Sequence, residues 1–255
     1  MKIGAQLYSV HNHTKTLEDF SETLKKVADI GYTSVQVSGT CDYEPEWLKE
    51  QLKATGLTCD LTHYSFDKVL ENPKKVTEDH KIFGCKYIGL GSMPGIWDNN
   101  TPAHWAEFKE KALPAAKVIA ENGGYYMYHN HAKEYESVDG MRAIDYLKDE
   151  FPASVLGFTL DTHWIQRGGE DPVAEFKRFK GRIPCVHYKD LITMPDGEIR
   201  FAPVGSGVQD FESIIRASLD LGVEFAFVEQ DDSYGEDPFK CLKESYDYLK
   251  SMGLK

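Results

Sequence analysis

Two hydrophobic patterns alternate along the whole chain. Short apolar runs rich in β-branched and aromatic residues indicate buried strands, and the longer segments between them show the three-to-four-residue spacing of amphipathic helices. This alternation is typical of a parallel sheet, and eight strands predict a closed (β/α)8 TIM barrel, a single domain over residues 1–255. The expected strands are residues 2–7, 33–37, 57–62, 86–90, 124–129, 155–161, 183–188 and 224–229.

The expected helices have recognisable ends. A polar residue that can accept a hydrogen bond from a backbone N–H group precedes each of four helical segments, as an N-cap does. These residues are Thr16, Thr101, Asp210 and Asp237. Pro114 lies within the otherwise helical segment 102–122, so we expect a kink or a break there.

Composition narrows the class of protein. The formal charge is −12, from 29 basic and 41 acidic residues, which argues against a nucleic acid partner because phosphates are bound by dense positive charge. No apolar run resembles a signal peptide or reaches the ~18 residues of a membrane span. The five cysteines form no CxxC pair, which favours reduced thiols and the cytoplasm. The oligomeric state, a homo-oligomer included, is left open.

Four residues of the kind that bind metals each stand at the end of an apolar run. Because the C-terminal ends of parallel barrel strands share one face, these side chains should converge there. Imidazole and carboxylate ligands without cysteine suit a divalent ion such as Mn²⁺, Mg²⁺, Co²⁺ or Zn²⁺. The four residues are His129, Asp161, His187 and Glu229.

The segment YHNHAKE holds further candidates for chemistry. Side chains alternate along a strand, so His129 and His131 share a face. One histidine can then bind the metal while His131 carries out acid–base work, since imidazole titrates near neutral pH. Glu134 follows in the loop, where it either reaches the same pocket or remains a solvated carboxylate.

The same alternation pairs Lys189 with His187, which places a cation beside the proposed metal site. A lysine there can stabilise an alkoxide or enediolate in a catalytic role, or it can form a structural salt bridge. His163 shares a face with Asp161, so it either supports a metal ligand or contacts sugar hydroxyls.

Weaker candidates complete the expected pocket. Trp164, Tyr8 and Trp97 can offer flat surfaces to a sugar ring, although such aromatic residues more often only pack, and His63 follows the third strand. A glycine-rich loop with Gly205 and Gly207 stands just before a helix, a weak indication of an anion site.

The chain resembles the xylose isomerase-like TIM barrels, the sugar phosphate isomerase and epimerase family to which endonuclease IV is related. The resemblance runs through GAQLYSV, ADIGYTSVQV, GLTCDLTH, GLGS, YHNH, LDTHW, DPVAEFKRFKGRIPCVHYKD, PVGSGVQDF and FVEQ. It covers nearly the whole sequence, and its most specific part is the block from Asp171 to Asp190 followed by PVGSGVQDF.

The resemblance implies a ligand set of Glu, Asp, His and Glu from successive strand ends. The last three match Asp161, His187 and Glu229, whereas His129 stands where many relatives have glutamate, as in a YHNH branch of the family. Two neutral imidazoles should favour Zn²⁺, Co²⁺ or Mn²⁺ over Mg²⁺. Epimerases of the family use two glutamates as paired acid–base groups, so here the proton must move through His131, Glu134, Lys189 or water.

The leading hypothesis is a divalent-metal-dependent sugar or sugar phosphate isomerase or epimerase, which abstracts a proton next to a metal-polarised carbonyl. Its catalytic residues would be Glu229, His131, Lys189 and Glu134, and its substrate contacts His163, His63, Trp164 and Tyr8. A lyase or dehydratase acting on a keto-sugar, a 3-keto-glycoside or an inosose fits the same residues. The alternative from another class is a non-catalytic sugar-binding barrel.

Overall fold

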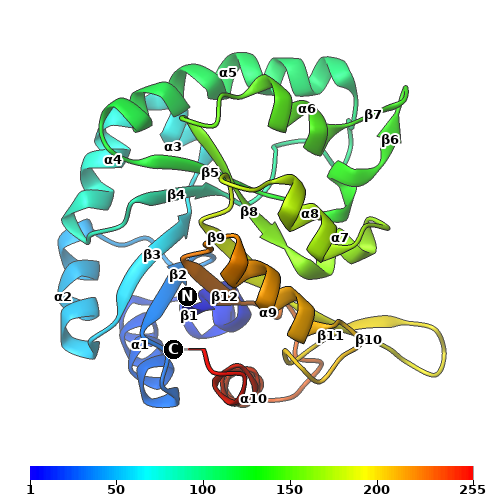
Figure 1. Cartoon of the computed structure of the whole chain (residues 1–255). Helices are drawn as coiled ribbons and strands as arrows, with labels where there is room; N and C mark the ends of the chain where they lie inside the picture. The colour runs from blue at the N-terminus through cyan, green and yellow to red at the C-terminus, as the bar shows by residue number, and fades with distance from the viewer. Residues whose placement is uncertain (255) are drawn as a thin grey trace.

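The computed structural model describes residues 1–254, and its centre is a closed barrel of eight parallel strands surrounded by helices (Figure 1). Around the barrel the strands follow the order β1-β12-β9-β8-β5-β4-β3-β2. Each overlaps one of the eight expected strands, so the predicted TIM barrel is confirmed. The strands are β1 (Lys2–Gln6), β2 (Ser34–Val37), β3 (Thr58–His63), β4 (Tyr87–Leu90), β5 (Tyr125–His129), β8 (Leu156–Asp161), β9 (Cys185–Tyr188) and β12 (Phe225–Val228).

The remaining elements are helices and two short hairpins. The helices are α1 (Leu17–Ile30), α2 (Pro45–Thr55), α3 (Phe66–Glu71), α4 (Pro73–Ile82), α5 (Pro102–Glu121), α6 (Ala143–Glu150), α7 (Thr162–Arg167), α8 (Pro172–Arg178), α9 (Phe211–Asp220) and α10 (Pro238–Ser251), with the 3-10 helices η1 (Leu7–His13) and η2 (Ala132–Tyr135). The hairpins are β6 (Ser137–Val138) with β7 (Met141–Arg142), and β10 (Asp190–Thr193) with β11 (Ile199–Ala202). None of the helices in residues 1–254 combines the length and apolar composition that crossing a membrane requires.

All four expected N-caps are confirmed, because each side chain accepts a hydrogen bond from a backbone N–H group in the first turn of its helix. Pro114 does not break the helix in which it lies. Helix α5 continues through it from Pro102 to Glu121. Proline removes one backbone hydrogen bond, whereas buried Ala112 and Ala116 pack on the core on both sides of it and hold the helix in place.

Alternation along the strands divides the barrel interior into layers. The lower layer is apolar and holds Leu61, Tyr87, Met127 and Phe227 with Cys185. Small residues leave room for these side chains, and a Cβ atom at Gly157 would lie only 2.7 Å from the sulfur of Met127. The next inward positions toward the C-terminal ends of the strands are polar, and they form the candidate site.

Candidate metal centre

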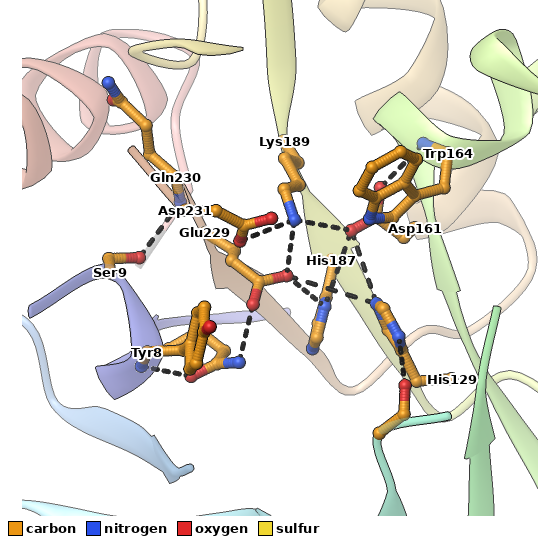
Figure 2. A network of polar contacts seen from close by, with 12 residues as sticks. Tyr8, Ser9, His129, Asp161, Trp164, His187, Lys189, Glu229, Gln230 and Asp231 are labelled. Atoms are coloured by element: carbon orange, nitrogen blue, oxygen red, sulfur yellow. Dashed lines mark hydrogen bonds and ion pairs between the residues drawn. The ribbon is translucent and has the colours of Figure 1, made fainter. Parts of the chain in front are cut away.

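The four predicted metal-binding side chains meet at the C-terminal end of the barrel (Figure 2). His129, Asp161 and His187 close strands β5, β8 and β9, and Glu229 directly follows β12. One potential ligand atom from each residue lies within 4.8 Å of the other three. None of the four residues exposes more than 4% of its surface. The predicted convergence is therefore present, and these residues can hold a metal ion.

Hydrogen bonds outside the cluster orient both imidazole rings. The Nδ1 atom of His129 lies 3.0 Å from the carbonyl oxygen of Gly91, and the Nε2 atom of His187 lies 2.6 Å from Oε1 of Gln36. A ring nitrogen that donates to such an acceptor leaves the opposite nitrogen with its lone pair free in the neutral ring. Nε2 of His129 and Nδ1 of His187 thus face the carboxylates of the cluster.

Each of the two carboxylates likewise uses one oxygen for a supporting hydrogen bond and turns the other toward the cluster. The Oδ1 atom of Asp161 accepts the backbone N–H of Trp164 at 2.9 Å, and Oε1 of Glu229 accepts the side-chain N–H of Gln6 at 2.6 Å. The other oxygen of each carboxylate points into the cluster, where Oδ2 of Asp161 lies 3.4 Å from His129 Nε2. Each residue therefore uses one atom for support and presents another to the centre.

Nδ1 of His187 faces both carboxylates of the cluster. It is buried and lies 2.9 Å from Oε2 of Glu229 and 3.6 Å from Oδ2 of Asp161. These contacts are favourable only when the nitrogen carries a proton or when a cation lies between it and the carboxylates. Two imidazole nitrogens and two carboxylate oxygens are a donor set that suits Zn²⁺, Mn²⁺ or Co²⁺, so the residues fit a divalent ion.

Lys189 supplies the positive charge beside the cluster. Its ammonium group lies 3.2 Å from Oε2 of Glu229, 2.7 Å from Oδ1 of Asp231 and 3.8 Å from Oδ2 of Asp161. Burial alone would lower the pKa of Lys189, but these three carboxylates outweigh it and raise the pKa above its usual value. The side chain is therefore a permanent cation at neutral pH and a poor proton donor.

His187 carries a proton in the absence of metal. Burial opposes the charged ring, but the carboxylates of Glu229 and Asp161 outweigh burial and raise the pKa of His187 to about 9. The pKa of His131 moves the other way, to about 3, because of burial and the neighbouring His129 and Lys189. The two rings thus differ in charge at pH 7.

A cavity of about 360 Å³ opens above the cluster and is small enough for a monomeric ligand. Three predicted residues outside the cluster, Tyr8, His63 and His131, line it together with Lys189 and with His129 and Glu229 of the cluster. Nδ1 of His63 lies 3.2 Å from the hydroxyl of Ser38, while its Nε2 atom is buried without a hydrogen-bond partner. The structure thus brings His63, a weak candidate in the sequence, directly to the site.

Two predicted substrate contacts lie to one side of this cavity. His163 is 2% exposed and packs between Trp164 and Phe201, with ring centroids 4.7 and 4.6 Å away. Trp164 packs against His131, and the Lys189 ammonium lies 5.2 Å from the centroid of its ring. Neither His163 nor Trp164 lines the cavity, so their contacts are with the protein groups that surround Lys189.

Glu134 neither lines the cavity nor is solvated, so neither of the two alternatives from the sequence describes it. Its buried carboxylate accepts hydrogen bonds from the hydroxyl of Tyr128 at 2.7 Å and from the backbone N–H of His131 at 2.8 Å. Tyr128 points to the outer side of β5, where it packs against Phe108 of α5. Glu134 is thus held on that outer side and fixes the turn that carries His131.

The glycine-rich loop does not offer its N–H groups to an external anion. The carboxylate of Asp190 is fully buried and accepts the backbone N–H groups of Gly205, Gly207 and Gln209 at 2.9 to 3.3 Å. The expected anion site is therefore filled by the protein's own carboxylate. The sequence pattern of the loop is the same whether its N–H groups bind a carboxylate of the chain or a phosphate, so the sequence alone could not identify Asp190 as the partner.

Several residues of the site were not identified from the sequence. Gln6 and Gln36 orient Glu229 and His187, and Asp231 neutralises Lys189 while lining the cavity. Gln6 and Gln36 lie on β1 and β2 at the same level as the predicted ligands. A position near the C-terminal end of a strand, which selected the ligands, could have identified both glutamines.

The fold and the site together define a class of proteins. The profile of the xylose isomerase-like TIM barrel family matches residues 24–252, and the chain belongs to this family. Its curated relatives include the inosose dehydratase of Geobacillus kaustophilus, 25% identical over 193 residues. That alignment covers 67% of this chain and 61% of the relative. The inosose dehydratase of Bacillus thuringiensis is 22% identical, with 91% of this chain and 89% of the relative covered.

Solved structures show the same fold. A sugar phosphate isomerase/epimerase from Parabacteroides distasonis has a TM-score of 0.81 and 25% identity, covering 98% of this chain and 97% of that one. A probable 3-DHS dehydratase from Bacillus anthracis has a TM-score of 0.75 and 18% identity, covering 98% and 99%. The relatives are named as enzymes, and both isomerising and dehydrating activities occur among their names.

A pair of histidine variants tests the ligand set. We expect His129→Ala to weaken Zn²⁺ binding about 100-fold or more, because the ring supplies one of four ligand atoms. His131→Ala should keep the metal affinity near that of the original protein, because its ring lies outside the cluster. Isothermal titration of both metal-free proteins measures this. If His131→Ala loses the metal and His129→Ala keeps it, the two residues exchange roles.

Metal binding should also release a proton. A metal binds only the neutral ring of His187, whose pKa is about 9, so binding at pH 7 releases about one proton. We expect the apparent affinity to rise with pH and to level off above pH 9. In the metal-free protein the raised pKa of His187 also adds to the free energy of unfolding. This contribution is fully present below about pH 6.5 and is lost as the pH rises through 9.

Titrations at pH 7 in two buffers of different ionisation enthalpy measure the number of protons released. The His187→Gln protein is the matched control, because it lacks the titrating ring. Equal heats in the two buffers for the unmodified protein would contradict the charged state assigned to His187.

Proposed function

We propose that the protein is a metal-dependent enzyme that removes a proton from the carbon next to a carbonyl group of a sugar or cyclitol. The observation that carries this proposal is the buried cluster of His129, Asp161, His187 and Glu229, with the Lys189 cation beside it and a small cavity above. A divalent ion in the cluster would polarise the carbonyl and make the adjacent C–H bond acidic.

Lys189 serves this reaction as a fixed positive charge. Its ammonium is held by carboxylates on the side of the cluster and reaches the cavity wall. Removing a C–H proton next to a carbonyl places negative charge on the carbonyl oxygen. A buried cation stabilises that charge more strongly than water does, because the surroundings need not reorganise.

The proton needs an acceptor outside the ligand set. Glu229 is not free for this task, because one of its oxygens accepts from Gln6 and the other faces the cluster. Asp231, His131 and His63 remain, and all three line the cavity. Asp231 is the best base of the three, since burial and the nearby Glu229 raise its pKa to about 6. Burial and the neighbouring His129 lower the pKa of His131 to about 3 and that of His63 well below its usual value.

Elimination of water is the outcome that this arrangement favours. After the base takes the proton, the C–H electron pair forms a carbon–carbon double bond while the C–O bond at the next carbon breaks. The departing hydroxyl takes up the proton held by the base and leaves as water. Two curated relatives are named inosose dehydratases. Epimerisation by two glutamates requires a second carboxylate across from Glu229, and the corresponding side chain here is His129, with both ring nitrogens engaged. Isomerisation through Asp231 is the second candidate.

The proposal can be tested with an inosose and D-fructose in D₂O, using protein loaded with Mn²⁺, Co²⁺ or Zn²⁺. We expect deuterium in the recovered substrate or product, and a product of the inosose that is lighter by one water. Mass spectrometry and NMR distinguish this product from an isomer of unchanged formula. The absence of both exchange and product with every metal would contradict the proposed function.

The Lys189→Met variant tests the role of the cation. We expect kcat to fall about 100-fold, as when one electrostatic stabiliser of a transition state is removed, while metal remains bound. Lys180→Met is the matched control, because Lys180 is exposed at the end of α8. Metal content and kcat are measured on both proteins. A kcat unchanged by Lys189→Met would assign the lysine to structure alone.

A further inference from the structure

We infer that the substrate is uncharged: a polyhydroxylated ketone with neither a phosphate nor a carboxylate group. This inference rests on the proposed function and narrows its substrate class. It separates the chain from the reaction that the name of the Parabacteroides distasonis protein implies, since a sugar phosphate carries a dianion. Three features of the cavity and its surroundings support it independently.

The first feature is the balance of charge. Among the described residues that line the cavity, Lys189 is the only lysine or arginine. It is 1% exposed and is already surrounded by Asp161, Glu229 and Asp231. Three carboxylates outnumber this ammonium, and a divalent ion only brings the formal charge to zero. A dianionic ligand would find no unpaired cation and would approach Asp231 on the cavity wall.

The second feature is the glycine-rich loop after β11. Backbone N–H groups before a helix are a common phosphate site. Here Asp190 occupies them, with its Oδ2 atom 3.0 Å from the N–H nitrogen of Gly205 and 2.9 Å from that of Gly207. A Cβ atom at Gly207 would lie 2.3 Å from the same carboxylate, so no space remains between them. A phosphate cannot displace a group that is part of the chain.

The third feature is the set of unpaired polar atoms on the wall. Nε2 of His63 and Nδ1 of His131 are both buried without a hydrogen-bond partner. Ser38 adds a hydroxyl to the same lining, beside the ring of His63. Groups that both donate and accept hydrogen bonds match the hydroxyls of a neutral sugar or cyclitol, which also do both. They offer a phosphate no compensating charge.

One exposed cation near the rim needs a separate test. Lys68 lies over the ring of Tyr64, a lining residue, and its ammonium is 3.7 Å from Oδ1 of Asp42. Its side chain is 57% exposed and could turn toward a ligand. A surface ion pair of this kind contributes little binding energy. The Lys68→Ala variant determines whether it recruits a phosphate.

The test compares ligands that differ only in a phosphate: myo-inositol with myo-inositol 1-phosphate, and D-fructose with D-fructose 6-phosphate. Titration calorimetry on Zn²⁺-loaded protein, up to high millimolar ligand, gives the dissociation constants. We expect the neutral member of at least one pair to bind about tenfold or more tightly than its phosphate, with little dependence on salt. Equal or tighter binding of the phosphate, or no binding of any neutral member, would overturn the inference. Binding of a phosphorylated ligand that is present in the original protein and lost in Lys68→Ala would also overturn the inference, because Lys68 would then recruit the phosphate.

An Asp231→Asn variant tests the charge argument directly. Removing this negative charge should shift the ratio of the two dissociation constants about tenfold in favour of the phosphate. Asp98→Asn is the control, because it makes the same change on an exposed loop and should leave the ratio unaltered. An unaltered ratio in Asp231→Asn would refute the role of cavity charge. D-Fructose that binds without C–H exchange would contradict the proposed reaction while leaving the substrate class intact.

Discussion

The structure depends on how two buried carboxylates are balanced by positive charge. Oδ2 of Asp161 and Oε2 of Glu229 point toward the same small volume, where water cannot screen their repulsion. An unpaired buried charge is strongly destabilising, so the fold must supply cations in the same place. Lys189 does this permanently, and the proton on His187 does it in the absence of metal. A divalent ion can replace that proton, which connects the stability of the barrel to its chemistry.

The barrel makes this arrangement possible by separating apolar and polar layers. Successive residues along each strand alternate between the barrel interior and the surrounding helices, so a single strand contributes to both cores and to the site. In β5, Met127 packs in the apolar layer and His129 enters the cluster two residues later. Supporting hydrogen bonds come from other strands and from loops, as with Gln36 of β2 and Gly91 after β4. Orientation of the ligands is therefore a property of the closed barrel.

The regular geometry of parallel barrel strands explains why so much could be predicted from one sequence. Short apolar runs indicated all eight strands, the polar residues at the ends of four runs indicated the cluster, and alternation along the chain from His187 indicated Lys189. This regularity does not extend to loops, where the direction of a side chain depends on the local turn. Glu134 follows β5 by only a few residues, yet the turn directs it to Tyr128 on the outer side. Asp190 likewise turns back into its own loop, a partnership that sequence spacing does not reveal.

Asp231, the third carboxylate around Lys189, links the metal ligands to the choice of substrate. Two of the four potential metal ligands are carboxylates, those of Asp161 and Glu229, and the other two are the imidazoles of His129 and His187. Asp231 adds another negative charge, but it faces the cavity and the Lys189 ammonium instead of the ligand centre. With a divalent ion bound, the site as a whole is formally neutral, yet its negative edge lies on the side that the ligand approaches. A neutral ketone meets no repulsion there, and Asp231 is placed to accept a proton from it.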